Sequence, residues 1–263
     1  MSLIEAFSRV VLDGTGFDRV TEEDVVAVVR EALHQGTGGR IITPNVDILR
    51  QAQVDRGVRA YLDEADLVVA DGMPLVWASR LSGTPLPERV AGSSLVWSLS
   101  RGLGHDARSV FILGGTPGRD GDIDGATRAA GRLAAACPGL RIAGCHSPGY
   151  GFERDTARFA DACRQVVATR PDMVYVGLGF PKQEWVITQL RERLPNAWFI
   201  GCGAAVNFVA GDQDRAPRWM QRTGLEWAHR LGSEPRRLAG RYLRHDAPYA
   251  LRLLATSATA RRP

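Results

Sequence analysis

The sequence has few cysteines and no long apolar run, and each scarcity excludes a class of protein. The four cysteines (Cys137, Cys145, Cys163 and Cys202) are scattered, with no CxxC pair and no Cys/His ligand spacing. We therefore expect reduced, mostly buried thiols rather than a disulfide framework or a zinc site. No stretch approaches the roughly 20 uninterrupted apolar residues of a membrane span, and the N-terminus has no signal-peptide pattern. We expect a cytoplasmic protein.

Positive charge is concentrated near the C-terminus. The 263 residues carry a formal net charge of +4, and Lys182 is the single lysine. From Arg215 onward there are eleven arginines and three acids (Glu226, Glu234 and Asp246), a balance of +8 that leaves −4 for the preceding part. A basic tail on a net acidic body predicts contact with an anionic surface. Nucleic acid is not expected, because the aromatic residues lie with Leu and Met rather than on a basic strand face.

Apolar runs bounded by Gly or Pro alternate with helical patterns through most of the chain, which predicts an α/β fold. The strands are predicted at Val10–Leu12, Arg40–Ile42, Leu67–Ala70, Val110–Leu113, Leu140–Ala143, Met173–Val176 and Trp198–Ile200. Helices are predicted from a capping box at Thr21 toward Leu33, and at Met73–Leu81, Ser93–Leu99, Asp124–Ala136, Asp155–Ala168 and Lys182–Leu194. Such alternation favours a mostly parallel sheet with helices on both faces.

The pattern changes after Gly211, where the chain becomes helical and rich in Arg. Three residues are expected to break it into short helices: Pro217, Gly224 and Pro235. We predict an α/β domain over residues 1–211 and a small C-terminal helical appendage over residues 212–263. Its interleaved Arg and Trp suit helices docked on the sheet, a segment lying on an anionic membrane surface, or both.

Polar residues follow two of the predicted strands, where ligands of open α/β sheets bind. Thr43 and Asn45 come after the strand that ends at Ile42, and either could cap the next helix or face a ligand. Asp71 and Gly72 follow another apolar strand. An Asp before Gly often only forms a turn, but a partly desolvated carboxylate at a strand end is also well placed as a general base.

Two glycine-bearing strand ends suit a phosphate or ribose, because glycine permits close backbone approach and helix N-termini favour anions. These positions are Gly114 and Gly115 at the first, and Gly177, Gly179, Lys182 and Gln183 at the second, where Glu184 falls in the same first turn of the predicted helix. A third turn, Gly201–Ala205, fits either close packing or ligand approach.

Asp120, Asp122 and Asp124 form a DxD-like pattern, which many sugar-nucleotide transferases use to hold a divalent cation. Here the aspartates sit among glycines at a predicted helix start. Asp at that place caps the helix and complements its dipole. We predict capping and no metal site.

Taken together, these stretches resemble the WecG/TagA/CpsF glycosyltransferases. The matching segments run in order along nearly the whole chain: TPN at Thr43–Asn45, VVADGMPLVWASR at Val68–Arg80, LPERVAGSSL at Leu86–Leu95, FILGG at Phe111–Gly115, SPGYGFE at Ser147–Glu153, VGLGFPKQE at Val176–Glu184, GAAVNFVAG at Gly203–Gly211 and RAPRWMQRTGLEWAHRLGSEPRRLAGRYL at Arg215–Leu243.

The resemblance implies a Rossmann-like α/β core and an inverting, metal-independent transfer without a cofactor. The implied donor is a UDP-sugar (N-acetylmannosamine, its uronic acid or glucose), and the implied acceptor is a polyprenyl-diphosphate-linked sugar. The products would feed teichoic acid, enterobacterial common antigen or exopolysaccharide. The resemblance also places the protein peripherally on the inner face of the cell membrane through its C-terminal tail. The oligomeric state stays open, a homo-oligomer included.

Carried over by position, the resemblance assigns a role to each candidate residue. Asp71 is the expected catalytic base, and Thr43 and Asn45 are expected to line the pocket around sugar and acceptor. Arg89 and Gln183 are expected to contact the donor and stabilise the departing diphosphate, a task that falls to such groups where no metal is bound. Further expected substrate contacts are Gly72, Gly114, Gly115, Gly177, Gly179, Lys182, Arg230, Arg236, Arg237 and Arg241. Ser94 stands where the family usually has an acid, which leaves acceptor choice open.

Two other functional classes have less support in the sequence. An NAD(P)-dependent oxidoreductase or another Rossmann-type nucleotide-binding protein would want GxGxxG directly after the first strand. The turn at Asp13–Gly16 lacks the third glycine and is followed by Phe17. A non-catalytic module that docks on membranes or nucleic acid is suggested by the basic tail alone.

Overall fold

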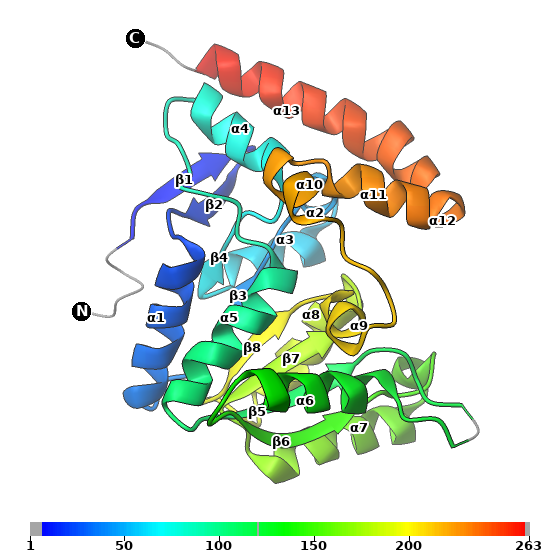
Figure 1. Cartoon of the computed structure of the whole chain (residues 1–263). Helices are drawn as coiled ribbons and strands as arrows, with labels where there is room; N and C mark the ends of the chain where they lie inside the picture. The colour runs from blue at the N-terminus through cyan, green and yellow to red at the C-terminus, as the bar shows by residue number, and fades with distance from the viewer. Residues whose placement is uncertain (1–6, 120, 261–263) are drawn as a thin grey trace. The chain divides into compact units, whose positions relative to one another are not determined.

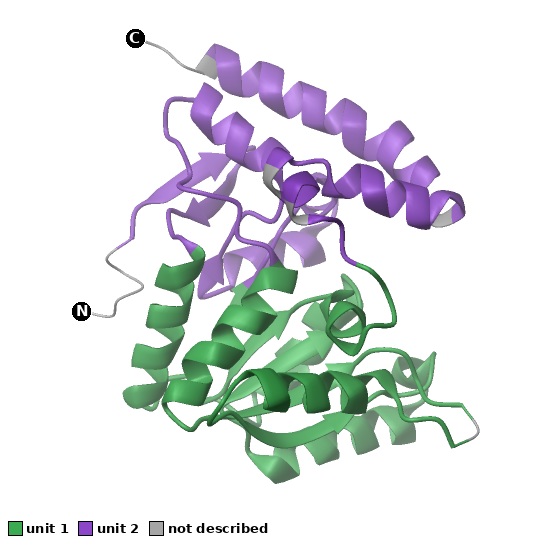
Figure 2. Ribbon diagram, viewed as in Figure 1, with its two compact units in different colours: residues 1–4, 22–41, 92–214 green, residues 5–21, 42–91, 215–263 purple. Residues whose placement is uncertain are grey.

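The structure is a computed structural model that describes residues 7–119 and 121–260. The chain divides into two compact units (Figure 2). Unit 1 holds Glu22–Ile41 and Gly92–Asp214, and unit 2 holds residues 7–21, Ile42–Ala91 and residues 215–260. The C-terminal segment thus groups with two earlier parts of the chain. The predicted boundary between residues 211 and 212 stays a prediction.

Unit 1 is built on parallel strands that end at a common edge. Their order is β3 (Gly39–Ile42, whose last residue belongs to unit 2), β8 (Trp198–Gly201), β7 (Met173–Gly177), β5 (Ser109–Gly114) and β6 (Arg141–His146). The register pairs Leu113 with Val176 and Gly114 with Gly177. The residues that follow β5 and β7 therefore leave the sheet side by side.

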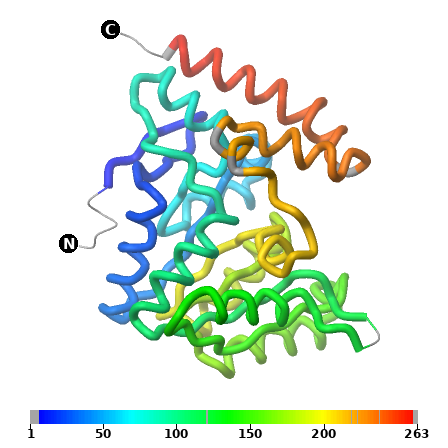
Figure 3. Tube along the Cα trace, in the orientation of Figure 1, coloured from blue at the N-terminus to red at the C-terminus, as the bar shows by residue number. Residues whose placement is uncertain are grey.

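Helices cover both faces of this sheet (Figure 1). One face packs on α7 (Thr156–Thr169) and α8 (Lys182–Arg191), and its core includes alternate strand residues such as Leu113, Val176 and Phe199. On the other face lie α1 (Glu22–His34), α5 (Gly92–His105), α6 (Gly125–Ala136) and α9 (Ala205–Ala210). There Tyr175 of β7 hydrogen-bonds through its hydroxyl to Ser100 of α5, at 2.9 Å. The traces of α1 and α5 run side by side in Figure 3.

Unit 2 begins with an antiparallel hairpin of β1 (Arg9–Leu12) and β2 (Thr15–Asp18). The buried Asp18 carboxylate accepts hydrogen bonds from Arg9 Nε and from the backbone N–H of Val68, both at 2.8 Å. These bonds tie the hairpin to β4 (Leu67–Val68). The Val69 N–H donates to the Ile42 carbonyl at 3.0 Å, so β4 lies beside β3 and the sheet order becomes β4-β3-β8-β7-β5-β6.

The rest of unit 2 is helical. It contains α2 (Val46–Ala52), α3 (Arg56–Asp63), α4 (Met73–Leu81), α10 (Arg218–Thr223), α11 (Glu226–Ser233), α12 (Pro235–Arg241), the π-helical turn η3 (Tyr242–Asp246) and α13 (Ala247–Ala260). Helix α13 packs on α4, and the Tyr249 hydroxyl donates to Asp13 Oδ2 at 2.5 Å. Gly224 links α10 to α11 with φ +79°, where any Cβ would press on Met73 of α4.

The predicted Rossmann-like α/β class is confirmed, and every strand predicted from the sequence is present. The hairpin strand β2 is additional. The helix predicted at Ser93–Leu99 extends to His105, because its late glycines are packing positions rather than breaks: a Cβ at Gly102 would collide with Val26, and one at Gly104 with the Pro138 carbonyl.

The predicted breaks in the tail are confirmed, since α10, α11 and α12 are separate short helices. Helix α8 ends at Arg191, earlier than predicted. In the described part of the chain the four cysteines are free, as expected. None of the helices formed by the described residues combines the length and hydropathy that a membrane span requires.

Candidate functional site

Three of the predicted site residues lie together in unit 2, where β3 and β4 end. The backbone N–H of Asp71 donates to the Pro44 carbonyl at 2.9 Å, which holds Asp71 beside the Thr43–Asn45 segment. Thr43 is buried. Asn45 caps α2, since its Oδ1 accepts from the Ile48 N–H at 3.1 Å. The capping alternative is therefore confirmed for Asn45, whose Nδ2 makes no hydrogen bond to a described residue.

Arg89 reaches the same strand end. The N–H of the next residue, Val90, donates to the Ala70 carbonyl at 3.0 Å, so the chain brings Arg89 next to Asp71. Arg89 Nη1 lies 3.0 Å from Glu226 Oε2 and 3.9 Å from Asp71 Oδ1. Glu226 Oε1 is in turn 3.6 Å from Arg215 Nε. We call Asp71, Arg89, Glu226 and Arg215 the Asp71 cluster.

The Asp71 cluster alternates in charge and is only partly open to solvent. Its side chains are 29% exposed at Asp71, 14% at Arg89, 12% at Glu226 and 20% at Arg215. Such a group can accept a proton at a carboxylate and hold an anionic oxygen at a guanidinium, both in a setting where charge interactions are stronger than in bulk water. Gly72 follows Asp71 directly and is the N-cap residue of α4. A Cβ placed on Gly72 would lie 4.0 Å from the Cβ of Asn45.

A second ionic group joins α2 to the C-terminal helices. Asp47 and Arg50 of α2 pair at 2.6 Å, Arg241 Nη1 lies 3.6 Å from Asp47 Oδ2, and Asp246 of η3 faces both Arg50 (3.5 Å) and Arg241 (3.7 Å). Burial and the neighbouring Asp47 raise the pKa of Asp246 to about 6, against the attraction of the two arginines. Arg241, predicted to reach a substrate phosphate, is thus paired within unit 2.

The other predicted arginines of the tail lie on neighbouring helices. Arg230 is half-buried on α11, four residues after Glu226, and Arg236 is exposed on α12. The side chain of Arg237 lies outside the described part of the structure.

In unit 1 the predicted glycines stand at the ends of β5 and β7. Gly114 adopts φ +122°, and a Cβ there would collide with the Gly177 carbonyl. Gly115, at φ +86°, donates its N–H to the same carbonyl at 3.3 Å. These glycines are needed for the close approach of two strand ends. Gly179 has φ +79° and no atom within 4 Å of where a Cβ would lie, so glycine is favoured there by the backbone conformation and not by close packing.

Gln183 is held from two sides at the start of α8. Its Oε1 accepts from the Gly203 N–H at 3.0 Å, and its Nε2 donates to Glu184 Oε1 at 3.2 Å. Glu184 has no exposed surface. Burial raises the pKa of Glu184 to about 7, although the charge of Arg40 and the hydrogen bond from Gln183 act in the opposite direction. A Cβ at Gly201 would collide with both side chains, so glycine is required beneath them.

Lys182 is paired rather than free. Its Nζ lies 2.9 Å from Glu153 Oε1, and this hydrogen bond lowers the pKa of Glu153. The ion pair joins the start of α8 to the Ser147–Glu153 segment. An incoming phosphate would have to compete with Glu153 for this ammonium group.

The DxD-like pattern behaves as a helix start. Asp124 Oδ1 accepts from the Thr127 N–H at 2.8 Å and caps α6, which confirms the predicted capping role at this position. Asp120 lies outside the described residues. Among the residues that are described, no group of three or more His, Cys, Asp or Glu side chains is arranged to hold a metal ion.

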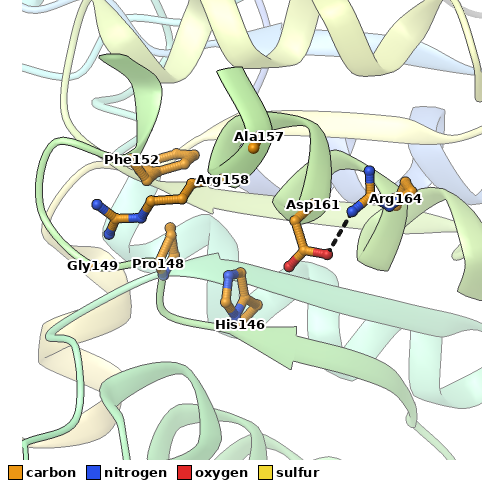
Figure 4. A pocket seen from close by; sticks show the side chains of 8 residues that line it. All are labelled: His146, Pro148, Gly149, Phe152, Ala157, Arg158, Asp161 and Arg164. Atoms are coloured by element: carbon orange, nitrogen blue, oxygen red, sulfur yellow. Dashed lines mark hydrogen bonds and ion pairs between the residues drawn. The ribbon is translucent and has the colours of Figure 1, made fainter. Parts of the chain in front are cut away.

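A pocket of about 400 Å³ opens beside the end of β6 in unit 1 (Figure 4). It is lined by His146, Pro148, Gly149, Phe152, Ala157, Arg158, Asp161 and Arg164. Asp161 Oδ1 pairs with Arg164 Nη2 at 2.9 Å, and burial lowers the pKa of His146. None of the site residues predicted from the sequence lines this pocket.

Three polar residues of these groups were missed by the sequence analysis as site residues: Arg215, Glu226 and Glu184. Glu226 is an isolated acid within an Arg-rich segment, and that isolation is the signal which could have marked it. Glu184 directly follows Gln183, but a helix position alone does not tell that its carboxylate is fully buried.

Comparison with known proteins matches this chain to one family. The sequence model described as the glycosyl transferase WecG/TagA/CpsF family matches residues 10–263. A relative from Bacillus spizizenii, named N-acetylglucosaminyldiphosphoundecaprenol N-acetyl-beta-D-mannosaminyltransferase, is 34% identical over 78% of this chain and 75% of its own length. A relative of the same name from Bacillus subtilis is 32% identical over 77% of this chain and 75% of its own length. The resemblance seen in the sequence motifs is confirmed.

Proposed function

Because the chain belongs to the WecG/TagA/CpsF family of glycosyl transferases, we propose that it transfers a sugar from a UDP-sugar to a polyprenyl-diphosphate-linked sugar. The names of the two relatives state transfer of an N-acetyl-beta-D-mannosaminyl group to N-acetylglucosaminyldiphosphoundecaprenol. We therefore propose UDP-N-acetylmannosamine as the first donor to test, with its uronic acid and UDP-glucose as the alternatives. The product would be a lipid-linked precursor of a cell-envelope or extracellular polysaccharide.

The observation that carries this proposal is the Asp71 cluster, where a partly exposed carboxylate stands 3.9 Å from a guanidinium at a strand end. In the proposed reaction the Asp71 carboxylate takes the proton of the acceptor hydroxyl. The hydroxyl oxygen attacks the anomeric carbon, the bond from that carbon to the diphosphate oxygen breaks, and UDP leaves with the electron pair. Attack opposite the leaving group inverts the configuration at the anomeric carbon.

The departing diphosphate gains negative charge, which needs donors that are already in place. Arg89 is proposed to supply one of them, because its guanidinium is partly buried and its partners hold it in one orientation. In unit 1, Gln183 and the glycines at the ends of β5 and β7 are proposed to contact the donor. Thr43 and Asn45 are proposed to line the pocket around sugar and acceptor.

We further propose that the C-terminal helices rest on an anionic membrane surface, where a lipid-linked acceptor would be found. Large apolar side chains are exposed on them, including Trp219 (60%), Trp227 (47%), Leu243 (60%) and Leu251 (69%). Interleaved with arginines, such residues suit the membrane interface. Replacing Trp219 and Trp227 together by Ser is expected to reduce flotation with vesicles that contain phosphatidylglycerol. Unchanged flotation would contradict the membrane role.

The experiment that tests the function measures UDP release with a panel of UDP-sugars, a short-chain polyprenyl-diphosphate N-acetylglucosamine acceptor, and EDTA present or absent. We expect release that depends on one donor, is stimulated by acceptor and is not abolished by EDTA. The variant Asp71→Asn is expected to lose at least a hundredfold in turnover, the range for a general base, with donor binding retained. Full activity in this variant would remove Asp71 from the mechanism, and no turnover with any donor would contradict the proposed donor class.

A further inference from the structure

Arg89 stands between two carboxylates and is closer to one of them. The same nitrogen, Nη1, is 3.0 Å from Glu226 Oε2 but 3.9 Å from Asp71 Oδ1. The contact with Glu226 is a charge-assisted hydrogen bond, whereas the contact with Asp71 is an ion pair that is too long for a hydrogen bond. Glu226 thus holds the guanidinium, and Arg89 makes no hydrogen bond as short as this one to Asp71.

From this geometry we propose that Glu226 is a positioning residue that keeps the Arg89 guanidinium off Asp71, so that the Asp71 carboxylate can meet the acceptor hydroxyl. The inference rests on the proposed function of Asp71 as the base. Glu226 lies on α11, 155 positions after Asp71 in the chain, and it contacts Arg89 rather than the reacting atoms.

The burial of the pair supports this role. Glu226 is 12% exposed and Arg89 is 14% exposed, so water competes little for their hydrogen bond. Glu226 also faces Arg215, whose Nε is 3.6 Å from its other oxygen. The Glu226 carboxylate thus faces two guanidinium groups. The two carboxylates and two guanidinium groups of the Asp71 cluster together carry a net charge of zero. Without Glu226 the sum is +1, and Arg89 keeps its ion pair with Asp71.

Closure of Arg89 onto Asp71 would harm a general base in two ways. A guanidinium hydrogen bond stabilises the ionised carboxylate and lowers its pKa, which weakens it as a proton acceptor. It also occupies the oxygen that the acceptor hydroxyl must approach. Because α11 carries Glu226, the C-terminal segment would contribute to catalysis without touching substrate.

The test is the pH dependence of kcat/KM in the full-length protein carrying Glu226→Gln, which keeps the size of the side chain but not its charge. We expect the acidic limb of the profile to move to lower pH by about one unit, the lower end of the shift that a nearby opposite charge causes. We also expect kcat on the plateau to fall severalfold, with the KM for the donor changing less. Glu226→Asp, which restores the charge, should return the acidic limb toward its wild-type position.

Three controls separate the possible outcomes. Glu23→Gln makes the same change at an exposed site on α1 and should leave the profile unchanged. A wild-type profile in Glu226→Gln, with Asp71→Asn inactive, would overturn the role of Glu226 and leave the function intact. An active Asp71→Asn would instead contradict the base itself. If Glu226→Gln does not fold, the neutral variant Glu226→Ala is measured instead, and an unshifted acidic limb in that variant would overturn the inference.

Discussion

Replacing Glu184 by Gln removes an ionisable carboxyl from a position without solvent exposure and changes the size of the side chain very little. Burial raises the pKa of this carboxyl from an ordinary value of 4.5 to about 7. In the folded protein Glu184 therefore keeps its proton over a pH range in which the unfolded chain has lost it. The Gln side chain does not titrate, so the variant lacks this dependence on pH.

The sign and size of the effect follow from proton linkage. A folded-state pKa above the unfolded value contributes stability that is fully present below about pH 4.5 and is lost as the pH rises through about 7. The difference between 7 and 4.5 corresponds to about 3 kcal/mol at 1.36 kcal/mol per pKa unit. The free energy of unfolding of Glu184→Gln, minus that of the wild type, should thus rise by about 3 kcal/mol between these limits. The attraction of Arg40 for the ionised carboxylate is already contained in this pKa, and any difference between Gln and the protonated Glu184 adds a constant that does not depend on pH.

The assay is urea unfolding followed by tryptophan fluorescence at several pH values between 4.5 and 8. Glu192→Gln, at the exposed end of the same helix, is the matched control and should show no such trend. A difference that stays flat, or that falls as the pH rises, would refute the assignment of Glu184 as a carboxyl whose burial outweighs the attraction of Arg40.

The remaining predictions concern stability at three other positions. Gly201→Ala should destabilise the fold by about 1–3 kcal/mol, because the new Cβ would collide with the Gln183 and Glu184 side chains; chemical unfolding measures it, and a wild-type midpoint would count against the close packing. Asp18→Ala should lower stability by about 1–3 kcal/mol, since the Val68 N–H loses its buried acceptor; a smaller loss would show that water replaces the carboxylate. The raised pKa of Asp246 means that its stabilising contribution is lost as the pH rises from about 4 through about 6, so Asp246→Asn should gain stability relative to the wild type over that range. Thermal unfolding at both ends of the range checks this sign, which an opposite trend would contradict.

Local patterns predicted those parts of the fold that depend on short-range information. Unbroken apolar runs marked the strands, because strands buried on both faces need apolar side chains at every position. Pro217 and Pro235 marked helix starts, because proline suits the beginning of a helix but not its middle. Glycine was less informative: Gly224 does end a helix, whereas Gly102 lies inside one.

The candidate site divides in the same way. The sequence by itself placed Thr43, Asn45 and Asp71 directly after predicted strands. Because the residues that follow parallel strands lie at one edge of the sheet, that placement was enough to mark them as site candidates. Only the tertiary structure decided which charges meet: Arg89 pairs with Glu226 across 137 positions, and Arg241 lies against Asp47 rather than being free. It also decided that Glu184 is wholly buried, while Glu192, directly after the end of the same helix, is exposed. Periodicity reports which face of an element is apolar, but the partner of a charged side chain depends on how distant segments pack, and that information is not present in any local window.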